Sequence, residues 1–147
     1  MILDTNGLSA LAEGDPALES VLRRALQLAI PVIVLGEYRY GISRSRNHLQ
    51  YEQWMTEYLP SFRILDVDEK TTISYSAVRA ELKKRGTPIP SNDVWIASLC
   101  RQHSLPLLSR DYFLRAQIKV SYLKLYLPLK CPRSRLRRVI ACWPASS

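Results

Sequence analysis

Residues 1–12 read Met-Ile-Leu-Asp-Thr-Asn-Gly-Leu-Ser-Ala-Leu-Ala, and this stretch predicts how the chain begins to fold. A short apolar run ends at Asp4, after which Leu8, Leu11 and Ala12 recur at helical spacing. A buried strand that passes through a short polar turn into a helix is the opening unit of an α/β fold. Asp4 then lies at the carboxyl end of that strand, where open α/β sheets bind their ligands.

The same alternation continues along the chain. Further strands are predicted at residues 31–34, 62–65 and 105–108. Helices are predicted at residues 16–26, 38–42, 48–59, 66–86 and 91–103. The helix at 66–86 begins with acidic residues and ends at Gly86, and Ser91 is expected to cap the last helix. The pattern indicates one domain built as a parallel sheet with helices on both faces.

Four acidic residues stand at corresponding places in this pattern. Asp4, Glu37 and Asp111 each follow a predicted strand, and Asp93 lies in the first turn of the last helix. The carboxyl ends of parallel strands meet at one edge of a sheet, so the four side chains are expected to converge there. Each also has a plainer interpretation, as a helix cap, a first-turn acid or a turn residue.

Carboxylates that gather in one cleft repel one another strongly, and a divalent cation is the simplest way to neutralise them. Oxygen ligands favour Mg²⁺, with Mn²⁺ able to substitute, over zinc or copper. A metal with open positions for water and phosphate suits hydrolysis of a phosphodiester bond. RNA and DNA share that phosphate, so this chemistry alone does not separate a ribonuclease from a deoxyribonuclease.

Four stretches resemble the PIN-domain ribonuclease toxins of the VapC type, from type II toxin–antitoxin pairs. They are Met-Ile-Leu-Asp-Thr-Asn at 1–6, Val-Ile-Val-Leu-Gly-Glu-Tyr-Arg-Tyr-Gly at 32–41, Ile-Pro-Ser-Asn-Asp-Val-Trp-Ile-Ala at 89–97 and Leu-Pro-Leu-Leu-Ser-Arg-Asp at 105–111. They occur in the family's order and cover about residues 1–115. The resemblance implies a PIN-like three-layer α/β/α sandwich with a short, mostly parallel central sheet.

The resemblance also implies roles for particular residues. Asp4 and Asp93 would be the most direct ligands of Mg²⁺, while Glu37 and Asp111 would complete the pocket or position water. Ser109 would place a hydroxyl near the metal or the scissile phosphate. Asn6 and Arg110 are further candidates for substrate binding, although an arginine in a loop is commonly only exposed. The residues that carry these expectations are Asp4, Glu37, Asp93, Asp111, Ser109, Asn6 and Arg110.

The implied activity is endonucleolytic cleavage of RNA, often structured RNA such as tRNA. A cognate antitoxin would be the protein partner, and the toxin is expected to pair as a homodimer. No targeting segment is visible, and the longest apolar stretch, residues 25–36, is shorter than the roughly 20 residues that span a membrane. Three cysteines, an odd number, favour a reducing compartment over a disulfide framework. We therefore expect a cytoplasmic protein.

The C-terminal part of the chain departs from the family pattern. Residues 1–113 hold equal numbers of basic and acidic residues, so the net charge of +8 belongs to residues 114–147, which hold no acid. We therefore predict a PIN domain at residues 1–120 and an atypical basic tail at 121–147, either disordered or accessory. A solvated tail is the plain interpretation of its charge. Its composition also fits a shifted reading frame or a fusion.

Several alternatives remain open from sequence alone. The tail could spoil the pocket and leave a catalytically silent protein that binds antitoxin or RNA. His48 and His103 could form a metal-independent acid–base pair, but His103 lies on the apolar stripe of its helix. Trp95 could stack on a base, although core packing is the commoner role. Tyr38 and its neighbours could line a substrate groove or a dimer face.

Overall fold

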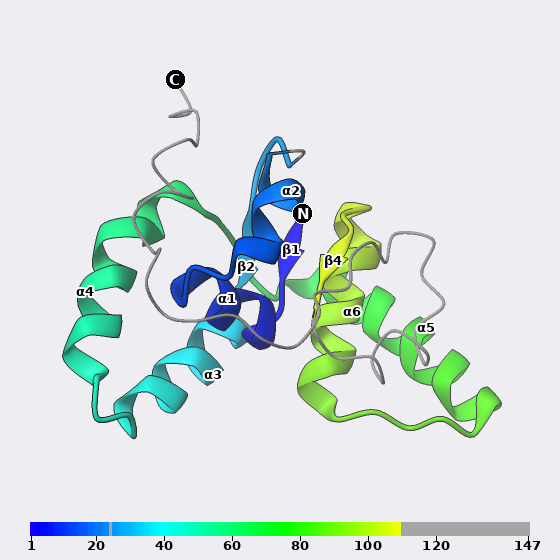
Figure 1. The fold of residues 1–147 in the computed structure, drawn as a ribbon. Helices are drawn as coiled ribbons and strands as arrows, with labels where there is room; N and C mark the ends of the chain where they lie inside the picture. The colour runs from blue at the N-terminus through cyan, green and yellow to red at the C-terminus, as the bar shows by residue number, and fades with distance from the viewer. Residues whose placement is uncertain (24, 110–147) are drawn as a thin grey trace.

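The fold is taken from a computed structural model, which describes residues 1–23 and 25–109 (Figure 1). In these residues four short strands form one sheet in the order β3-β2-β1-β4, and every pairing is parallel. The strands are β1 (Ile2–Leu3), β2 (Ala29–Pro31), β3 (Arg63–Leu65) and β4 (Leu107–Leu108). The predicted short parallel sheet is confirmed.

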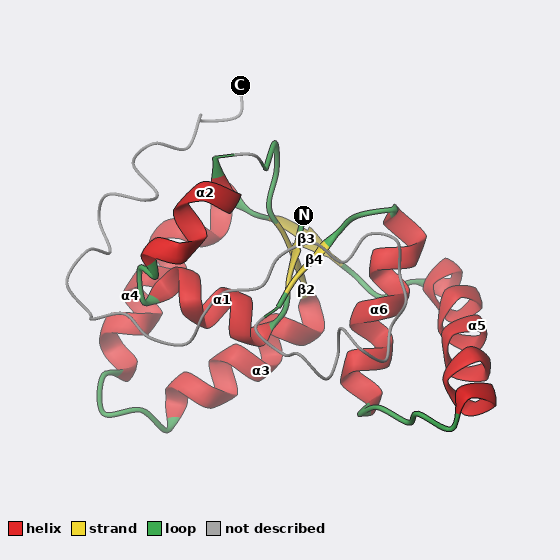
Figure 2. Cartoon of the chain, turned by 45° about the vertical axis from the view of Figure 1, so that its right-hand side comes forward, coloured by secondary structure: helices red, strands yellow, loops and turns green. Residues whose placement is uncertain are grey.

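Helices cover both faces of this sheet (Figure 2). Helices α5 and α6 lie on one side, and α1, α2, α3 and α4 lie on the other, which gives the predicted three layers. The helices are α1 (Thr5–Ala12), α2 (Glu19–Leu22), α3 (Val32–Ser43), α4 (His48–Tyr58), α5 (Glu69–Arg85) and α6 (Ser91–His103), with 3₁₀ turns at Pro16–Leu18 and Leu59–Ser61.

The strand order determines where a ligand site can form. The chain adds β2 and then β3 on one side of β1, and later returns to place β4 on the other side of β1. Strands β1 and β4 therefore form a switch point in the strand order, and the carboxyl ends of strands at such a point are where open α/β sheets bind ligands. Asp4 directly follows β1 and Ser109 directly follows β4, so both lie at this switch point.

Helix α5 ends at Gly86 as its sequence predicts, but it begins at Glu69 rather than at residue 66. Asp68 accepts a hydrogen bond from the backbone N–H of Thr71, and the Thr71 hydroxyl accepts one from the backbone N–H of Asp68. This capping box satisfies donors that the first turn leaves without partners. The Thr71 hydroxyl also donates to the Asp68 carboxylate, and this bond together with the Thr71 backbone N–H holds the pKa of Asp68 below its usual value. Gly86 ends the helix in the left-handed conformation, with φ of 66°, as a glycine C-cap should.

The predicted strand at residues 31–34 is wrong. The strand is β2, which ends at Pro31, and Val32 is already the first residue of α3. Pro31 occupies the N-cap position, where its missing N–H is not needed, so the helix begins immediately after it. The β-branched run Val32-Ile33-Val34 lies in the helix because burial of Val34 overrides its strand propensity. Glu37 consequently lies in the second turn of α3 rather than directly after a strand.

Two helix boundaries also differ from expectation. Ser91 is the first residue of α6, and Pro90 holds the N-cap position with no side-chain cap. The expected capping by Ser91 is therefore wrong. The helix predicted at residues 16–26 is broken into a 3₁₀ turn and the single turn of α2. Leu26 is 99% exposed instead of packing on the core.

The core lies between the sheet and its two helix layers. Ile2, Leu3 and Leu108 of the central strands are fully buried, and Cys100 of α6 is buried among them, as predicted for a small core residue. In the part of the chain that the structure describes, no helix is long and apolar enough to cross a membrane.

Candidate active site

Among the described acidic residues of the predicted site, Asp4 is the most enclosed. Its side chain is only 4% exposed, and one carboxylate oxygen, Oδ1, accepts a hydrogen bond of 2.6 Å from the backbone N–H of Gly7. Asp4 is thus the N-cap of α1, as its plainer interpretation predicted. Its backbone N–H donates to the carbonyl oxygen of Leu108 at 3.2 Å. Asp4 is therefore anchored at the junction of β1, β4 and α1.

The first turn of α1 lies directly on the end of β4. A β-carbon on Gly7 would lie 2.7 Å from the carbonyl oxygen of Leu108, closer than side-chain atoms approach a backbone. It would also lie 3.2 Å from Oδ1 of Asp4. Glycine at this position therefore allows the helix to approach the strand and keeps the Asp4 carboxylate at the edge of the sheet.

Glu37 joins three helices through its carboxylate. Its Oε2 atom accepts a hydrogen bond from the Thr5 hydroxyl at 2.5 Å, and its Oε1 atom accepts one from the Asn92 side-chain amide at 2.6 Å. Thr5 begins α1 and Asn92 lies in the first turn of α6, so two helix N-termini meet on one carboxylate of α3. Sequence reasoning assigned no role to Thr5 or Asn92. The signal was their position beside Asp4 and Asp93.

Asp93 lies in the first turn of α6, as predicted, and its side chain is partly buried. The N-terminus of a helix carries partial positive charge, so this position favours an ionised carboxylate. Its neighbour Asn92 donates to Glu37, so the starts of α1 and α6 meet the second turn of α3 at one edge of the sheet.

Of the remaining predicted residues, Ser109 and Asn6 belong to the described part of the chain. Ser109 is buried, 2% exposed, immediately after β4, whereas Asn6 is exposed on the first turn of α1. Asp111 and Arg110 lie outside the described residues, as does the tail at 121–147. Within residues 1–23 and 25–109, no three acidic, histidine or cysteine side chains are grouped closely enough to hold a metal ion.

The chemistry of the donors still fits a hard divalent cation. The predicted ligands at this edge are carboxylate oxygens, which Mg²⁺ and Mn²⁺ prefer. Asp4 is a buried carboxylate whose Oδ1 atom receives one backbone N–H. The two hydrogen bonds to Glu37 each come from a neutral group, so they orient this acid without neutralising its negative charge.

Tyr38 and Trp95, the aromatic candidates for substrate contact, both pack against other aromatic side chains. Tyr38 is 4% exposed and packs against Trp54, with ring centroids 6.4 Å apart. Burial raises the pKa of Tyr38 above its usual value, and nearby Tyr51 adds to this. Tyr38 therefore belongs to the core rather than to a substrate groove. Trp95 stacks on Tyr75 of α5 with centroids 4.0 Å apart, so it packs between helices.

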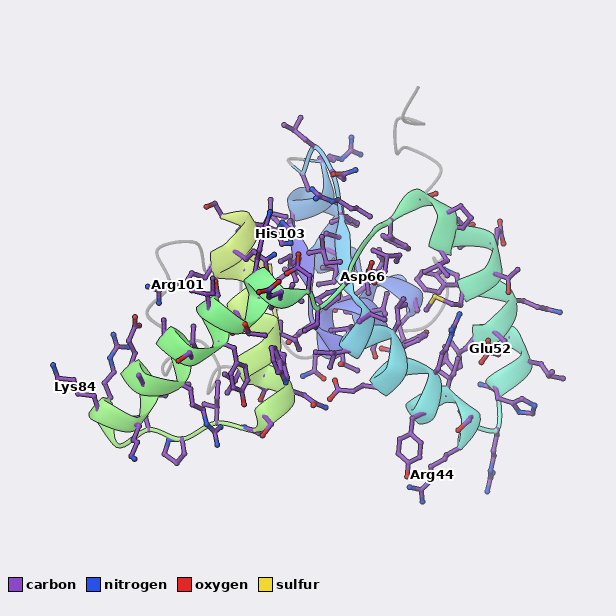
Figure 3. All side chains as sticks on the ribbon, turned by 180° about the vertical axis from the view of Figure 1, so that it is seen from behind. Arg44, Glu52, Asp66, Lys84, Arg101 and His103 are labelled. Atoms are coloured by element: carbon purple, nitrogen blue, oxygen red, sulfur yellow. The ribbon has the colours of Figure 1, made fainter. Side chains whose placement is uncertain are left out.

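The two histidines are not arranged as a pair. His48 begins α4 and His103 ends α6. Figure 3 places His103 beside α5, on the opposite side of the sheet from α4. A joint acid–base role is therefore excluded by the fold.

One cavity of about 520 Å³ lies away from the acidic edge. It is lined by the end of α1 at Ala12 and by α4 residues that include Tyr51, Trp54 and Tyr58. None of the predicted site residues lines it, so it has no part in the chemistry considered for Asp4 and Asp93.

Comparison with known proteins agrees with the fold and with the motifs. The pattern of the PIN domain matches residues 1–117. Ribonuclease VapC2 of Rickettsia felis is 38% identical over 71 residues, which are 48% of this chain and 53%, about half, of that protein. Toxin FitB of Neisseria gonorrhoeae is 30% identical over 76% of this chain and 87% of its own length.

A solved structure supports the same assignment. The structure of VapBC2 from Rickettsia felis bound to a DNA fragment from their promoter contains a chain that aligns with a TM-score of 0.68 and 28% identity. The alignment covers 80% of this chain and 92% of that one. The chain therefore belongs to the PIN-domain family. Within that family its relatives place it with the toxins of the VapC type.

Proposed function

We propose that this chain is the toxin of a toxin–antitoxin pair and that it cleaves RNA internally as a Mg²⁺-dependent endoribonuclease. The observation that carries the proposal is the carboxylate of Glu37, which receives hydrogen bonds from Thr5 and Asn92. These two residues are the immediate neighbours of Asp4 and Asp93. The names of the relatives, ribonuclease VapC2 and toxin FitB, support the activity and the biological role.

The proposed metal ligands are Asp4 and Asp93, with Asp111 and Glu37 completing the acidic pocket. A bound Mg²⁺ supplies an activated water and neutralises charge that builds on the phosphate during hydrolysis. Oδ1 of Asp4 is oriented by the Gly7 N–H, which fixes the rotation of the whole carboxylate. Holding a catalytic group in one orientation lowers the entropic cost of reaching the transition state.

The other residues of the edge would orient the substrate. Ser109 is proposed to donate its hydroxyl to a phosphate oxygen, because it directly follows β4 at the same edge of the sheet as Asp4. Asn6 is exposed on the first turn of α1 and is proposed to contact the RNA together with Arg110. Glu37 is proposed to hold the edge together through its two hydrogen bonds.

The test uses Asp4→Asn and Asp93→Asn with purified RNA and Mg²⁺. Asparagine keeps a side-chain oxygen that can accept the Gly7 N–H, so Asp4→Asn should preserve the cap and the fold. Removing either charge should abolish cleavage, while the circular dichroism spectrum stays that of the parent chain. The matched control is Asp66→Asn, since Asp66 is exposed between β3 and α5 (Figure 3). Cleavage at the parent rate by both site variants would refute the proposal.

The proposal extends to partners and location. A cognate antitoxin is the proposed protein partner, because the similar Rickettsia felis structure is of VapBC2. We further propose a homodimer, a structured RNA such as tRNA as the substrate, and the cytoplasm as the location. Co-expression with the product of a neighbouring small gene, followed by co-purification and relief of growth inhibition, tests the antitoxin. Titration with Mn²⁺ by calorimetry separates the enzyme from a catalytically silent binding protein.

A further inference from the structure

Glu37 is held by two side chains from helices far away in the sequence. Thr5 is 32 residues before Glu37 and Asn92 is 55 residues after it, yet each donates to a different oxygen of the same carboxylate. Helix α3, which carries Glu37, packs against both α1 and α6. The carboxylate therefore ties the first turns of α1 and α6 to each other.

Each donor lies directly beside one of the proposed metal ligands. Thr5 follows Asp4, and Asn92 precedes Asp93. A movement of either helix start changes the direction in which the neighbouring aspartate points, because backbone and side chain move together. The tie through Glu37 thus connects the orientation of Asp4 with that of Asp93.

We propose that Asn92 is a positioning residue: through Glu37 it holds the first turn of α6 against α1 and so sets the spacing of the Asp4 and Asp93 carboxylates. This inference rests on the proposed function. Groups that orient metal ligands commonly change metal affinity about 10- to 100-fold when they are removed. Asn92 is exposed and caps no helix, since the N-cap position of α6 belongs to Pro90. Its substitution should therefore affect the metal more than the fold.

The residue type at position 92 matters for a physical reason. The amide of Asn92 donates to Oε1 of Glu37 at 2.6 Å and carries no charge. An aspartate there would place a second carboxylate against Glu37 and repel it. An alanine would simply leave Oε1 without this donor, which makes Asn92→Ala the cleaner variant.

The first experiment measures Mn²⁺ affinity of the full chain by calorimetry, using Mn²⁺ alone and no RNA. Asn92→Ala should bind Mn²⁺ about 10- to 100-fold more weakly than the parent chain, with only a small decrease in unfolding temperature. The matched control is Asn47→Ala, because Asn47 is also an exposed asparagine next to a helix start and its side chain makes no cap hydrogen bond. This control should bind Mn²⁺ as the parent does.

The second experiment tests the hydrogen bond from the Thr5 hydroxyl to Glu37. Thr5→Val removes the hydroxyl that donates to Oε2 of Glu37, and Thr5→Ser keeps it. We expect weakened Mn²⁺ binding in Thr5→Val and near-parental binding in Thr5→Ser. Rescue by serine distinguishes loss of the hydrogen bond from a change in packing.

The possible failures are distinguishable. If the parent chain binds Mn²⁺ and cleaves RNA but Asn92→Ala matches it in affinity, the positioning role is refuted and the proposed function stands. The same conclusion follows if Asn92→Ala lowers only the unfolding temperature. If the parent chain neither binds Mn²⁺ nor cleaves RNA, the proposed function itself fails, and this inference fails with it.

Discussion

Gly7 and Leu108 come from opposite ends of the described fold, and a β-carbon on Gly7 would lie only 2.7 Å from the Leu108 carbonyl oxygen. This contact brings α1 against β4 at the point where Asp4 accepts the Gly7 N–H. Gly7→Ala should therefore force α1 and β4 apart and destabilise the fold by about 1–3 kcal/mol. Urea unfolding measures the loss, and RNA cleavage should fall with it.

Gly36 provides the matched control for this prediction. It lies in α3, and an added β-carbon would meet nothing within 4 Å. Gly36→Ala should stabilise the chain by about 0.5–1 kcal/mol, because alanine favours the helix over the unfolded chain. Equal stability changes in the two alanine variants would contradict the close packing of α1 on β4.

The residues that end α5 and α6 both have the left-handed conformation, and this leads to a second prediction. Gly86 ends α5 with φ of 66°, and Ser104 ends α6 with φ of 53°. An L side chain is strained in this region by about 1–2 kcal/mol. Gly86→Ala should therefore lower the free energy of unfolding by about 1 kcal/mol, whereas Ser104→Gly should raise it or leave it unchanged. A loss of stability in Ser104→Gly would show that the serine side chain has a role of its own.

Cys100 should be unreactive in the native protein. Burial raises its pKa to about 12 from an ordinary value of 9.0, so the thiol stays neutral at pH 8 and is a poor nucleophile. Iodoacetamide at pH 8 should label the peptide that contains Cys100 only after unfolding, as read by mass spectrometry. Rapid labelling of that peptide in the folded chain would contradict this packing.

The raised pKa of Cys100 also makes the stability of the fold depend on pH. Between about pH 9 and 12 the unfolded chain loses the Cys100 proton while the folded chain keeps it. Ionisation therefore favours the unfolded state, and stability contributed by the neutral thiol is lost as pH rises through this window. Cys100→Ala should show a shallower loss of stability there than the parent chain.

The hydrogen bond between Glu37 and Asn92 can be reversed in direction. In the double variant Glu37→Gln with Asn92→Asp, the new glutamine amide can donate to the new aspartate while its oxygen still accepts from the Thr5 hydroxyl. The total charge is also unchanged. The double variant should lose less stability than the sum of the losses in the two single variants, by about 0.5–1.5 kcal/mol. Simple additivity in urea unfolding would mean that the two residues are not coupled.

Removal of metal separates the carboxylate mechanism from a histidine mechanism. EDTA should abolish RNA cleavage, and added Mg²⁺ or Mn²⁺ should restore it. The double variant His48→Ala and His103→Ala should cleave at nearly the parent rate, because the two histidines lie on opposite sides of the sheet. Activity that survives EDTA but is lost in the histidine variant would overturn the proposed chemistry.

The sequence alone was sufficient for the class of fold. Apolar runs and helical periodicity predicted the parallel sheet and most helices, and Gly86 marked the end of α5 because a glycine C-cap depends on local backbone geometry. Local rules were less reliable where tertiary burial competes with propensity. The run Val32-Ile33-Val34 lies in α3, where Val34 is buried. Leu26 is exposed because α2 is one turn long.

The positions of Asp4 and Asp93 could be predicted, since each stands beside a local signal in its own segment. Their surroundings could not. Thr5 and Asn92 meet on Glu37 across 32 and 55 residues, and Gly7 meets the Leu108 carbonyl across the sheet. Such contacts depend on the strand order and on how the helices pack, because hydrogen bonds between distant segments form only after the chain has brought them together. The sequence therefore determined which chemical groups this protein has, and the tertiary structure decided which of them hold each other in place.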